Sequence, residues 1–292
     1  MEKINGRWSF IWVQYYKWYF DIWYFWWAWR FSNSGQEVAT FAKKHFVDIL
    51  KSNSHFKTGN YGQALIETFL NIDIKLPSEE GKSKLDEYSK NSPKNSMATM
   101  MRNENSDIAN TTGCTACVAL ITKNKIYVAN SGDSRAVLCK GGKAVDMSED
   151  HKPDNPKEKA RIEKAKGFVE DNRVNGILNL SRSLGDLEYK KNPDLKPDEQ
   201  LVISRPDIKE EEIKADSDFL LIACDGIWDC LTSQKACDYV KEKMAKSSPS
   251  KSGVKFTSVI EAMLDSILAP DVASSQGIGC DNMSCILVQF KK

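Results

Sequence analysis

The chain has 292 residues, of which 41% are hydrophobic and 28% are charged, a composition typical of a soluble globular protein. It excludes a disordered, collagenous or repeat-built protein. Lysine and arginine number 41 and aspartate and glutamate 40, so no charge bias draws the chain toward nucleic acid or an anionic membrane. Tryptophan is spread unevenly, because seven of the eight lie in the first 29 residues and the other is Trp228.

The aromatic segment 8–31 resembles a membrane span in length, but Lys17, Asp21 and Arg30 interrupt it. Such charges are costly in hydrocarbon, so we expect no spanning helix, and membrane anchoring by 8–31 remains a weaker alternative. No signal-peptide pattern is present, and the eight cysteines do not form a short secreted framework. These features predict a cytoplasmic or nuclear protein with reduced cysteines.

The pair Cys114 and Cys117 has a spacing found in zinc and redox motifs. A zinc site needs a second pair of ligands at similar spacing, and the sequence has none. Because residues 115–121 continue as an apolar run, we expect both thiols to lie in a core strand.

The first helix is expected from Ser34, since Ser34 and Glu37 have capping-box spacing and apolar residues follow on one face through Leu50. A second helix is predicted over 62–71. Residues 78–112 are rich in Ser, Lys, Asn and Glu, which predicts a polar surface loop.

The strands expected next are short and separated by turn residues, which predicts an antiparallel meander over 114–122, 125–129, 135–139 and 143–146. A helix that begins at Pro156 should end near Gly167. Further strands are predicted over 201–204, 219–224 and 283–290, and helices over 233–245 and 256–268. Blocks of strands and helices without strict alternation predict an α+β fold with antiparallel sheets in a single domain.

Acidic turns adjoin three of these apolar strands. Asp225 and Asp229 follow one strand, Asp133 follows a second, and Asp281 precedes a third. Carboxylates held at the ends of buried strands suit hard divalent cations such as Mg²⁺ or Mn²⁺. Each turn alone is better explained by the turn propensity of Asp and Gly.

Together, seven motifs match one family in sequence order. They are Asn110-Thr-Thr-Gly-Cys-Thr-Ala116, Asn130-Ser-Gly-Asp-Ser-Arg135, Glu149-Asp-His-Lys-Pro153, Arg173-Val-Asn-Gly176, Leu180-Ser-Arg-Ser-Leu-Gly-Asp186, Ala223-Cys-Asp-Gly-Ile-Trp-Asp229 and Asp281-Asn-Met-Ser284. The chain thereby resembles the metal-dependent serine/threonine protein phosphatases (type 2C, PPM family) over residues 34–290.

The resemblance implies two antiparallel β-sheets packed as a sandwich and flanked by helices on both outer faces, with a pair of Mg²⁺ or Mn²⁺ ions at one edge. By motif position, Asp225 and Asp281 would bind the metal pair, and Asp133 and Asp229 would contribute to a weaker third site. The metals would activate a water for attack on phosphorus, so no protein nucleophile is implied. Arg182 and Asp186 would support the loop beside the cleft, and we expect a structural role for His151.

Two motifs of the family are absent from this chain. They are Met-Glu-Asp and Asp-Gly-His-Gly-Gly, which supply further carboxylates, including the one that bridges the metals, and a histidine proposed as general acid. They should precede Gly35, in the position that the tryptophan-rich segment occupies.

Tryptophan codons contain GG, so the same bases read one position later would be rich in Gly and Asp codons. With suitable synonymous codons, residues 5–10 shift to Met-Glu-Asp-Gly-His, and residues 21–31 shift to Ile-Phe-Gly-Ile-Phe-Asp-Gly-His-Gly-Gly if Trp26 is read from TGA. We therefore interpret residues 1–33 as an atypical segment translated out of frame and residues 34–292 as the phosphatase domain.

Two functions follow. The first is a Mg²⁺- or Mn²⁺-dependent phosphatase, expected to be a monomer, that acts on phosphoserine and phosphothreonine in proteins. The second is a catalytically impaired, phosphatase-like binding or regulatory module, because Asp225 and Asp281 alone cannot hold a competent metal pair. A segment translated out of frame should also leave one sheet incomplete and lower the stability of the fold. An apolar segment of similar length could still fill part of the gap.

Overall fold

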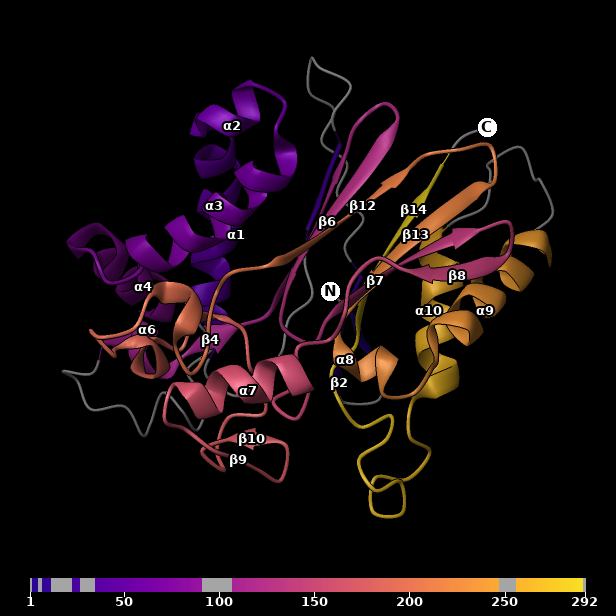
Figure 1. Ribbon diagram of the computed structural model, residues 1–292. Helices are drawn as coiled ribbons and strands as arrows, with labels where there is room; N and C mark the ends of the chain where they lie inside the picture. Colours follow the sequence, from indigo (N-terminus) through magenta and orange to yellow (C-terminus); the bar gives the residue numbers. More distant parts are fainter. Residues whose placement is uncertain are drawn as a thin grey trace.

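Two β-sheets lie face to face at the centre of the chain, with helices on both outer faces (Figure 1). The computed structural model describes residues 2–4, 7–11, 23–26, 35–90, 107–246 and 256–290, the first three ranges as backbone only. Both sheets are mainly antiparallel, which confirms the predicted α+β sandwich.

The first sheet has the strand order β12-β6-β5-β3 and is antiparallel throughout. Its strands are β3 (Trp23–Trp26), β5 (Ala116–Ile121), β6 (Lys125–Ser131) and β12 (Asp207–Glu212). All six residues of β5 are buried, as expected for an apolar strand covered on both faces.

The second sheet has the order β1-β2-β14-β13-β7-β8. Its strands are β1 (Glu2–Ile4), β2 (Arg7–Ile11), β7 (Arg135–Lys140), β8 (Lys143–Asp146), β13 (Ser217–Ala223) and β14 (Ser284–Gln289). The pair β2–β14 is parallel, whereas the other pairs in this sheet are antiparallel.

Helices α1 (Gln36–Ser52) and α3 (Tyr61–Lys75) pack outside the first sheet, and α9 (Ser233–Lys246) and α10 (Phe256–Ile267) outside the second (Figure 1). Short elements make up the connections: α2 (Ser54–Lys57), α4 (Glu79–Lys90), α6 (Ile108–Thr111), β4 (Gly113–Cys114), α7 (Pro156–Lys164), β9 (Val169–Glu170), β10 (Arg173–Val174), β11 (Leu184–Gly185), η1 (Leu187–Lys190), η2 (Pro197–Glu199) and α8 (Asp225–Trp228).

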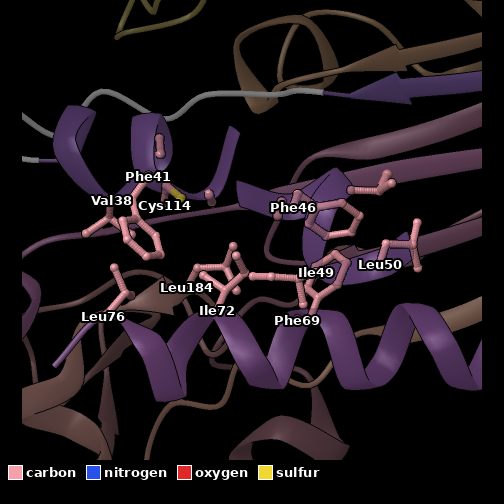
Figure 2. Close-up of a cluster of buried hydrophobic side chains, with 14 of the residues drawn as sticks. Val38, Phe41, Phe46, Ile49, Leu50, Phe69, Ile72, Leu76, Cys114 and Leu184 are labelled. Carbon is pink, nitrogen blue, oxygen red and sulfur yellow. The ribbon is translucent and has the colours of Figure 1, made fainter. Parts of the chain in front are cut away.

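The core has three layers because successive side chains of a strand point to opposite faces. In β5, Val118 and Leu120 face the helices α1 and α3, whereas Ala119 and Ile121 face the second sheet. Figure 2 shows the outer layer, in which side chains of the two helices interdigitate, for example Phe46 against Phe69 at 5.5 Å between ring centroids. Burial of each such large side chain stabilises the fold by about 1.5–3 kcal/mol.

Cys114 and Cys117 fall in different layers of this core. Cys114 packs with the helices and Cys117 lies between the sheets, and burial raises the pKa of both thiols. Their side chains therefore do not form a pair for metal or redox chemistry, in agreement with the expectation of core cysteines.

Most predicted elements are confirmed within a few residues, but several predictions were wrong. The meander is broken after Ser131, since β6 and β7 belong to different sheets and the Gly132–Ser134 turn crosses between them. The strand predicted over 201–204 is only a single bridge between Arg182 and Ile203. The sheet instead gains β12, whose charged residues lie on an exposed edge and therefore lack the apolar pattern of a buried strand.

The predicted polar loop over 78–112 contains helix α4, which buries Gly81, Leu85 and Tyr88 on one face. This spacing of four and three residues is typical of a helix. The segment was nevertheless predicted to be a loop, because it is rich in lysine and glutamate. The first helix also begins later than expected, because its N-cap is Gly35. Ser34 and the segment 91–106 lie outside the described residues.

The tryptophan-rich segment contributes backbone to both sheets. Strand β3 extends the first sheet beside β5, and β2 extends the second beside β14. The expected gap is thus occupied at the level of the backbone. Among the described residues, no helix combines the length and apolar character needed to cross a membrane.

Candidate active site at the edge of the sandwich

The predicted metal ligands gather where three neighbouring strands meet. In the second sheet Ala223, the last residue of β13, pairs with Arg135 at the start of β7 and with Cys285 in β14. Asp225 therefore leaves the sheet at the end from which Asp133 and Asp281 enter it. We call Asp133, Asp225, Asp229 and Asp281 the acidic edge.

Asp133 lies in the turn that crosses between the sheets. Gly132 has a φ of +125°, and a Cβ atom there would lie 2.5 Å from the Thr115 Cβ, so the position requires glycine. The Asn130 Nδ2 donates to the carbonyl oxygens of Gly132 at 3.0 Å and Glu149 at 2.9 Å. This fixed backbone holds the Asp133 side chain with only 1% of its surface exposed.

Asp225 and Asp281 are brought together by close backbone packing. A Cβ atom on Gly226 would lie 2.4 Å from the Asn282 carbonyl oxygen and 3.4 Å from the Asp281 Cβ. The Trp228 Nε1 donates to the Ala223 carbonyl oxygen at 2.8 Å and anchors the turn to the end of β13. Asp225 is buried, whereas Asp229 and Asp281 are exposed, so the acidic edge opens to solvent on one side.

A lysine lies against the acidic edge. The Lys152 Nζ lies 2.5 Å from the Asp133 Oδ2. Burial by itself lowers the pKa of Lys152, but the carboxylates of Asp133, Asp225 and Asp229 act on its ammonium and raise the pKa overall. Lys152 is therefore in direct contact with Asp133 and lies within electrostatic reach of Asp225 and Asp229.

Carboxylate oxygens are the donors that Mg²⁺ and Mn²⁺ prefer, so the chemistry of the acidic edge suits such ions. Within the described side chains, however, no group of three or more His, Cys, Asp or Glu is arranged to hold a metal ion. The described residues thus fit one side of a divalent metal site, and further donors are needed to complete it.

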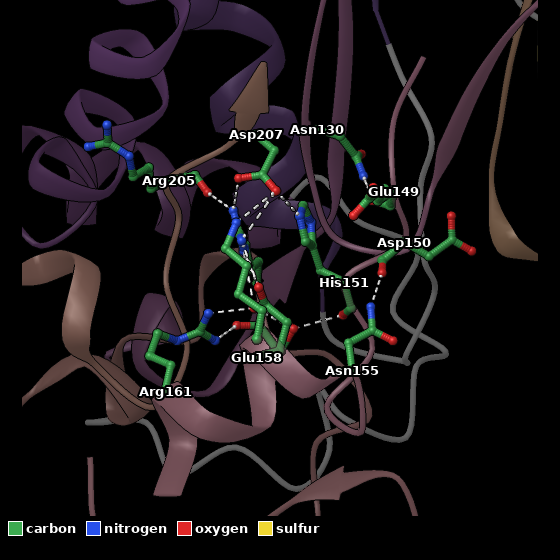
Figure 3. Close-up of polar contacts among 12 residues, drawn as sticks. Asn130, Glu149, Asp150, His151, Asn155, Glu158, Arg161, Arg205 and Asp207 are labelled. Atoms are coloured by element: carbon green, nitrogen blue, oxygen red, sulfur yellow. Dashed lines mark hydrogen bonds and ion pairs between the residues drawn. The ribbon is translucent and has the colours of Figure 1, made fainter. Parts of the chain in front are cut away.

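Beside the acidic edge lies a partly buried ion-pair network, shown in Figure 3. The Arg182 guanidinium, 2% exposed, donates to the Glu158 Oε1 at 2.6 Å and to the Asp207 Oδ1 at 2.8 Å. Arg161 also pairs with Glu158. Burial raises the pKa of Glu158, but the two arginines outweigh it and lower the pKa to about 2. We call Glu158, Arg161, Arg182 and Asp207 the arginine network.

His151 connects this network to the acidic edge. Its Nδ1 accepts a hydrogen bond from the Gly132 N–H at 3.2 Å, so the proton is on Nε2, which faces the Asp207 Oδ2 at 3.3 Å. The backbone N–H of His151 also donates to the Gly132 carbonyl oxygen at 2.9 Å. His151 thereby fixes the turn that carries Asp133, and it positions the next residue, Lys152.

Asp186 lies in a separate polar cluster on the side of the first sheet. Its Oδ2 accepts from the Ser183 Oγ at 2.6 Å, its backbone N–H donates to the Thr112 carbonyl oxygen at 2.8 Å, and burial raises its pKa. A Cβ atom on Gly113 would lie 2.0 Å from the Asp186 Oδ2. Asp186 therefore contacts the backbone that leads to Thr115, and Thr115 packs against Gly132 in the turn that carries Asp133.

Sequence reasoning missed Lys152, Glu158 and Asp207. Lys152 stands in the motif Glu149–Pro153, but nothing in a sequence says which carboxylates meet its ammonium. Glu158 looked like one of many charges on helix α7, and Asp207 begins the strand that was not predicted.

Comparison with known proteins identifies the family. Residues 31–275 match the family described as Protein phosphatase 2C. The chain belongs to the protein phosphatase 2C family. It is similar to "Probable protein phosphatase 2C 3" of Paramecium tetraurelia, with 47% identity over 260 residues that cover 89% of this chain and 81% of the relative. "Probable protein phosphatase 2C 21" of Arabidopsis thaliana is 40% identical over 281 residues, covering 89% and 77%.

Solved structures share the fold of this protein phosphatase 2C member. The serine-threonine phosphatase 2C from Toxoplasma gondii aligns with a TM-score of 0.66 at 18% identity, over 93% of this chain and 85% of the other. A sex determining protein from C. elegans aligns with a TM-score of 0.61 at 20% identity, over 92% and 56%. At these identities the similarity establishes the sandwich architecture alone.

Proposed function

We propose that this protein phosphatase 2C domain is a Mg²⁺- or Mn²⁺-dependent enzyme that hydrolyses phosphoserine and phosphothreonine in proteins. The observation that carries the proposal is the convergence of three separated chain segments, with Asp133, Asp225 and Asp281, on one end of the second sheet. A divalent metal pair, when bound there, would supply an activated water and neutralise charge on the phosphoryl oxygens. Asp225 and Asp281 would hold the pair, and Asp133 and Asp229 a weaker third ion.

We further propose that the chain as written has little or no activity. The described carboxylates do not form a complete metal site, and Lys152 already places a positive charge among three of them. An under-coordinated ion activates water poorly. The literal chain would then serve as a phosphatase-like binding module, which is the second candidate function.

The position of the N-terminal strands supports the out-of-frame interpretation of residues 1–33. The last residue of β3, Trp26, pairs with Val118, near the start of β5 and hence at the end of the sheet where β6 leads into Asp133. In the shifted frame, position 26 is the Asp of Asp-Gly-His-Gly-Gly. A carboxylate would therefore enter the acidic edge from the first sheet.

Strand β2 supports the same interpretation. It pairs in parallel with β14, with Phe10 beside Ser284, so β2 begins at the end of the sheet where Asp281 lies. In the shifted frame, positions 6 and 7 are the Glu and Asp of Met-Glu-Asp. The family match also begins at residue 31, after the tryptophan-rich text.

The experiment compares the chain as written with a version in which residues 5–31 carry the shifted-frame sequence. We expect Mn²⁺-dependent hydrolysis of a small phosphate ester to rise by about 100-fold or more on restoration, and chelation to abolish it. Phosphoserine and phosphothreonine peptides should be cleaved by the restored protein, with a phosphotyrosine peptide as the control.

The outcomes separate the candidates. Equal activity of both proteins would refute the argument from the missing motifs, and no activity in either would favour the binding module. Sequencing the first hundred or so bases of the gene and its transcript tests the frame directly. Codons that cannot encode Met-Glu-Asp and Asp-Gly-His-Gly-Gly in the next frame would end that interpretation.

A further inference from the structure

Two cysteines stand apart from the other six. Cys230 and Cys280 are partly exposed, whereas the remaining six are buried. Each of the two is bonded directly to a residue of the acidic edge, since Cys230 follows Asp229 and Cys280 precedes Asp281. The accessible thiols of this chain are thus concentrated at its candidate active site.

The backbone brings these cysteines together. The Cys230 Sγ lies 3.4 Å from the Gly226 carbonyl oxygen and 3.9 Å from the Ile267 carbonyl oxygen. Gly279 packs against the same Ile267 oxygen, because a Cβ atom on Gly279 would lie 2.4 Å from it. The Gly279 N–H also donates to the Cys230 thiol, so Cys230 contacts the residue next to Cys280.

Cys280 closes a short exposed loop. The loop is tied at its base by the Ala269 N–H, which donates to the Gly279 carbonyl oxygen at 3.0 Å, and the Cys280 Sγ lies 2.9 Å from the Ser275 Oγ. A bond to Cys230 would require the Cys280 side chain to leave Ser275. The loop is exposed, so this movement disturbs little packing.

We propose that Cys230 and Cys280 are an oxidisable thiol pair that forms an intramolecular disulfide in the presence of hydroperoxides and thereby distorts the acidic edge. In the first step one thiol sulfur takes an oxygen from the hydroperoxide ROOH, giving a sulfenic acid and ROH. In the second step the other thiol attacks that sulfur, an S–S bond forms, and the hydroxyl leaves with the thiol proton as water. The two thiols lose two electrons and the peroxide O–O bond is reduced.

The disulfide should weaken metal binding because of its geometry. An S–S bond of about 2.05 Å requires both sulfurs to leave their present partners, and each movement is transmitted to the adjoining Asp229 or Asp281. The distances from donor atoms to a bound metal fall within about 0.2 Å of their standard values, so donors that move apart hold the ion less well. This consequence rests on the proposed function, whereas formation of the disulfide does not.

The test treats the full chain with hydrogen peroxide, blocks the remaining thiols under denaturing conditions, and identifies linked peptides by mass spectrometry. We expect a loss of about 2 Da and a Cys230–Cys280 peptide that dithiothreitol cleaves. C230S and C280S should each abolish this linkage, and C237A, a change at a buried cysteine outside the acidic edge, should retain it.

A second readout follows Mn²⁺ binding to the frame-restored protein by electron paramagnetic resonance. We expect oxidation to weaken binding by about tenfold in the protein with all cysteines and not in C280S. Linkage of other cysteines, or sulfinic acids at both positions without a disulfide, would overturn the proposal. A disulfide that forms in a frame-restored protein without phosphatase activity would count against the proposed function alone.

Discussion

The acidic edge and the arginine network are joined through His151 and Lys152, yet they balance charge in opposite ways. In the arginine network, Arg161 and Arg182 face Glu158 and Asp207, so two cations meet two anions within the chain. In the acidic edge, Asp133, Asp225 and Asp229 act on the one ammonium of Lys152, so the carboxylates outnumber it. Buried charges that are paired with opposite charges stabilise the fold. A local excess of negative charge favours the binding of a positively charged ligand.

This difference predicts that changes in the two regions affect different properties. The arginine network crosses from helix α7 to strand β12 and holds the His151 segment between them, so its loss should unfold that part of the structure. The acidic edge lies at strand ends and carries repulsion, so its loss should affect function and leave stability intact. The following variants test this comparison.

The largest effect is expected at Asp225 in the frame-restored protein. D225N should lower Mn²⁺-dependent phosphatase activity by more than about 100-fold, because even residues that only orient a metal ligand change activity by roughly 10–100-fold. Its free energy of unfolding should stay the same or rise, since repulsion among carboxylates is relieved. Phosphate-ester hydrolysis measures the activity and urea unfolding the stability. Retained activity in D225N would show that Asp225 is not a metal ligand.

The opposite pattern is expected at Arg182. R182M should lower the free energy of unfolding by about 3–5 kcal/mol, because it leaves the buried Glu158 carboxylate with one cation fewer. K164M, which removes an exposed lysine that pairs with Glu199, is the matched control and should change stability little. Urea unfolding measures the free energy of unfolding of both variants. Similar effects of the two substitutions would show that the network is not a stabilising unit.

The sequence predicted the parts of the fold that depend on apolar periodicity. Strand β13 and helices α1, α9 and α10 were found within a few residues, because each buries a regular apolar face. The crossing at Gly132 was missed, because the same turn residues serve whether the next strand returns to the same sheet or enters the other. Strand β12 was missed because an edge strand is held by backbone hydrogen bonds to β6 rather than by apolar side chains.

The candidate site was predictable to a similar degree. The positions of Asp133, Asp225 and Asp281 followed from motifs at strand ends, and the sheet register brings those ends together. The role of Lys152 could not be foreseen, because it depends on contacts between residues far apart in the sequence. The same holds for Arg182, whose partners Glu158 and Asp207 lie 24 and 25 residues away along the chain.

A pH dependence of stability should separate the two regions further. Glu158 has a pKa lowered from 4.5 to about 2, so its stabilising contribution is complete above pH 4.5 and is lost as the pH falls toward 2. The difference corresponds to about 3 kcal/mol. Urea unfolding between pH 6 and 3 should show a steeper loss for the unaltered chain than for E158Q, with E163Q as the exposed control. Equal slopes for the unaltered chain and E158Q would contradict the assignment.

The smallest effect is expected at Lys152, where the two regions meet. Its ammonium lies 2.5 Å from the Asp133 Oδ2 and occupies a position that a metal ion at Asp133 and Asp229 would need. In the frame-restored protein, K152M should therefore tighten the weakest Mn²⁺ site by roughly tenfold, as expected when one like charge is removed at close range. Mn²⁺ titration followed by electron paramagnetic resonance measures this affinity. K157M, which removes an exposed lysine that pairs with Asp207, should leave it unchanged. Weaker Mn²⁺ binding in K152M would instead show that the lysine organises the carboxylates for the metal rather than competing with it.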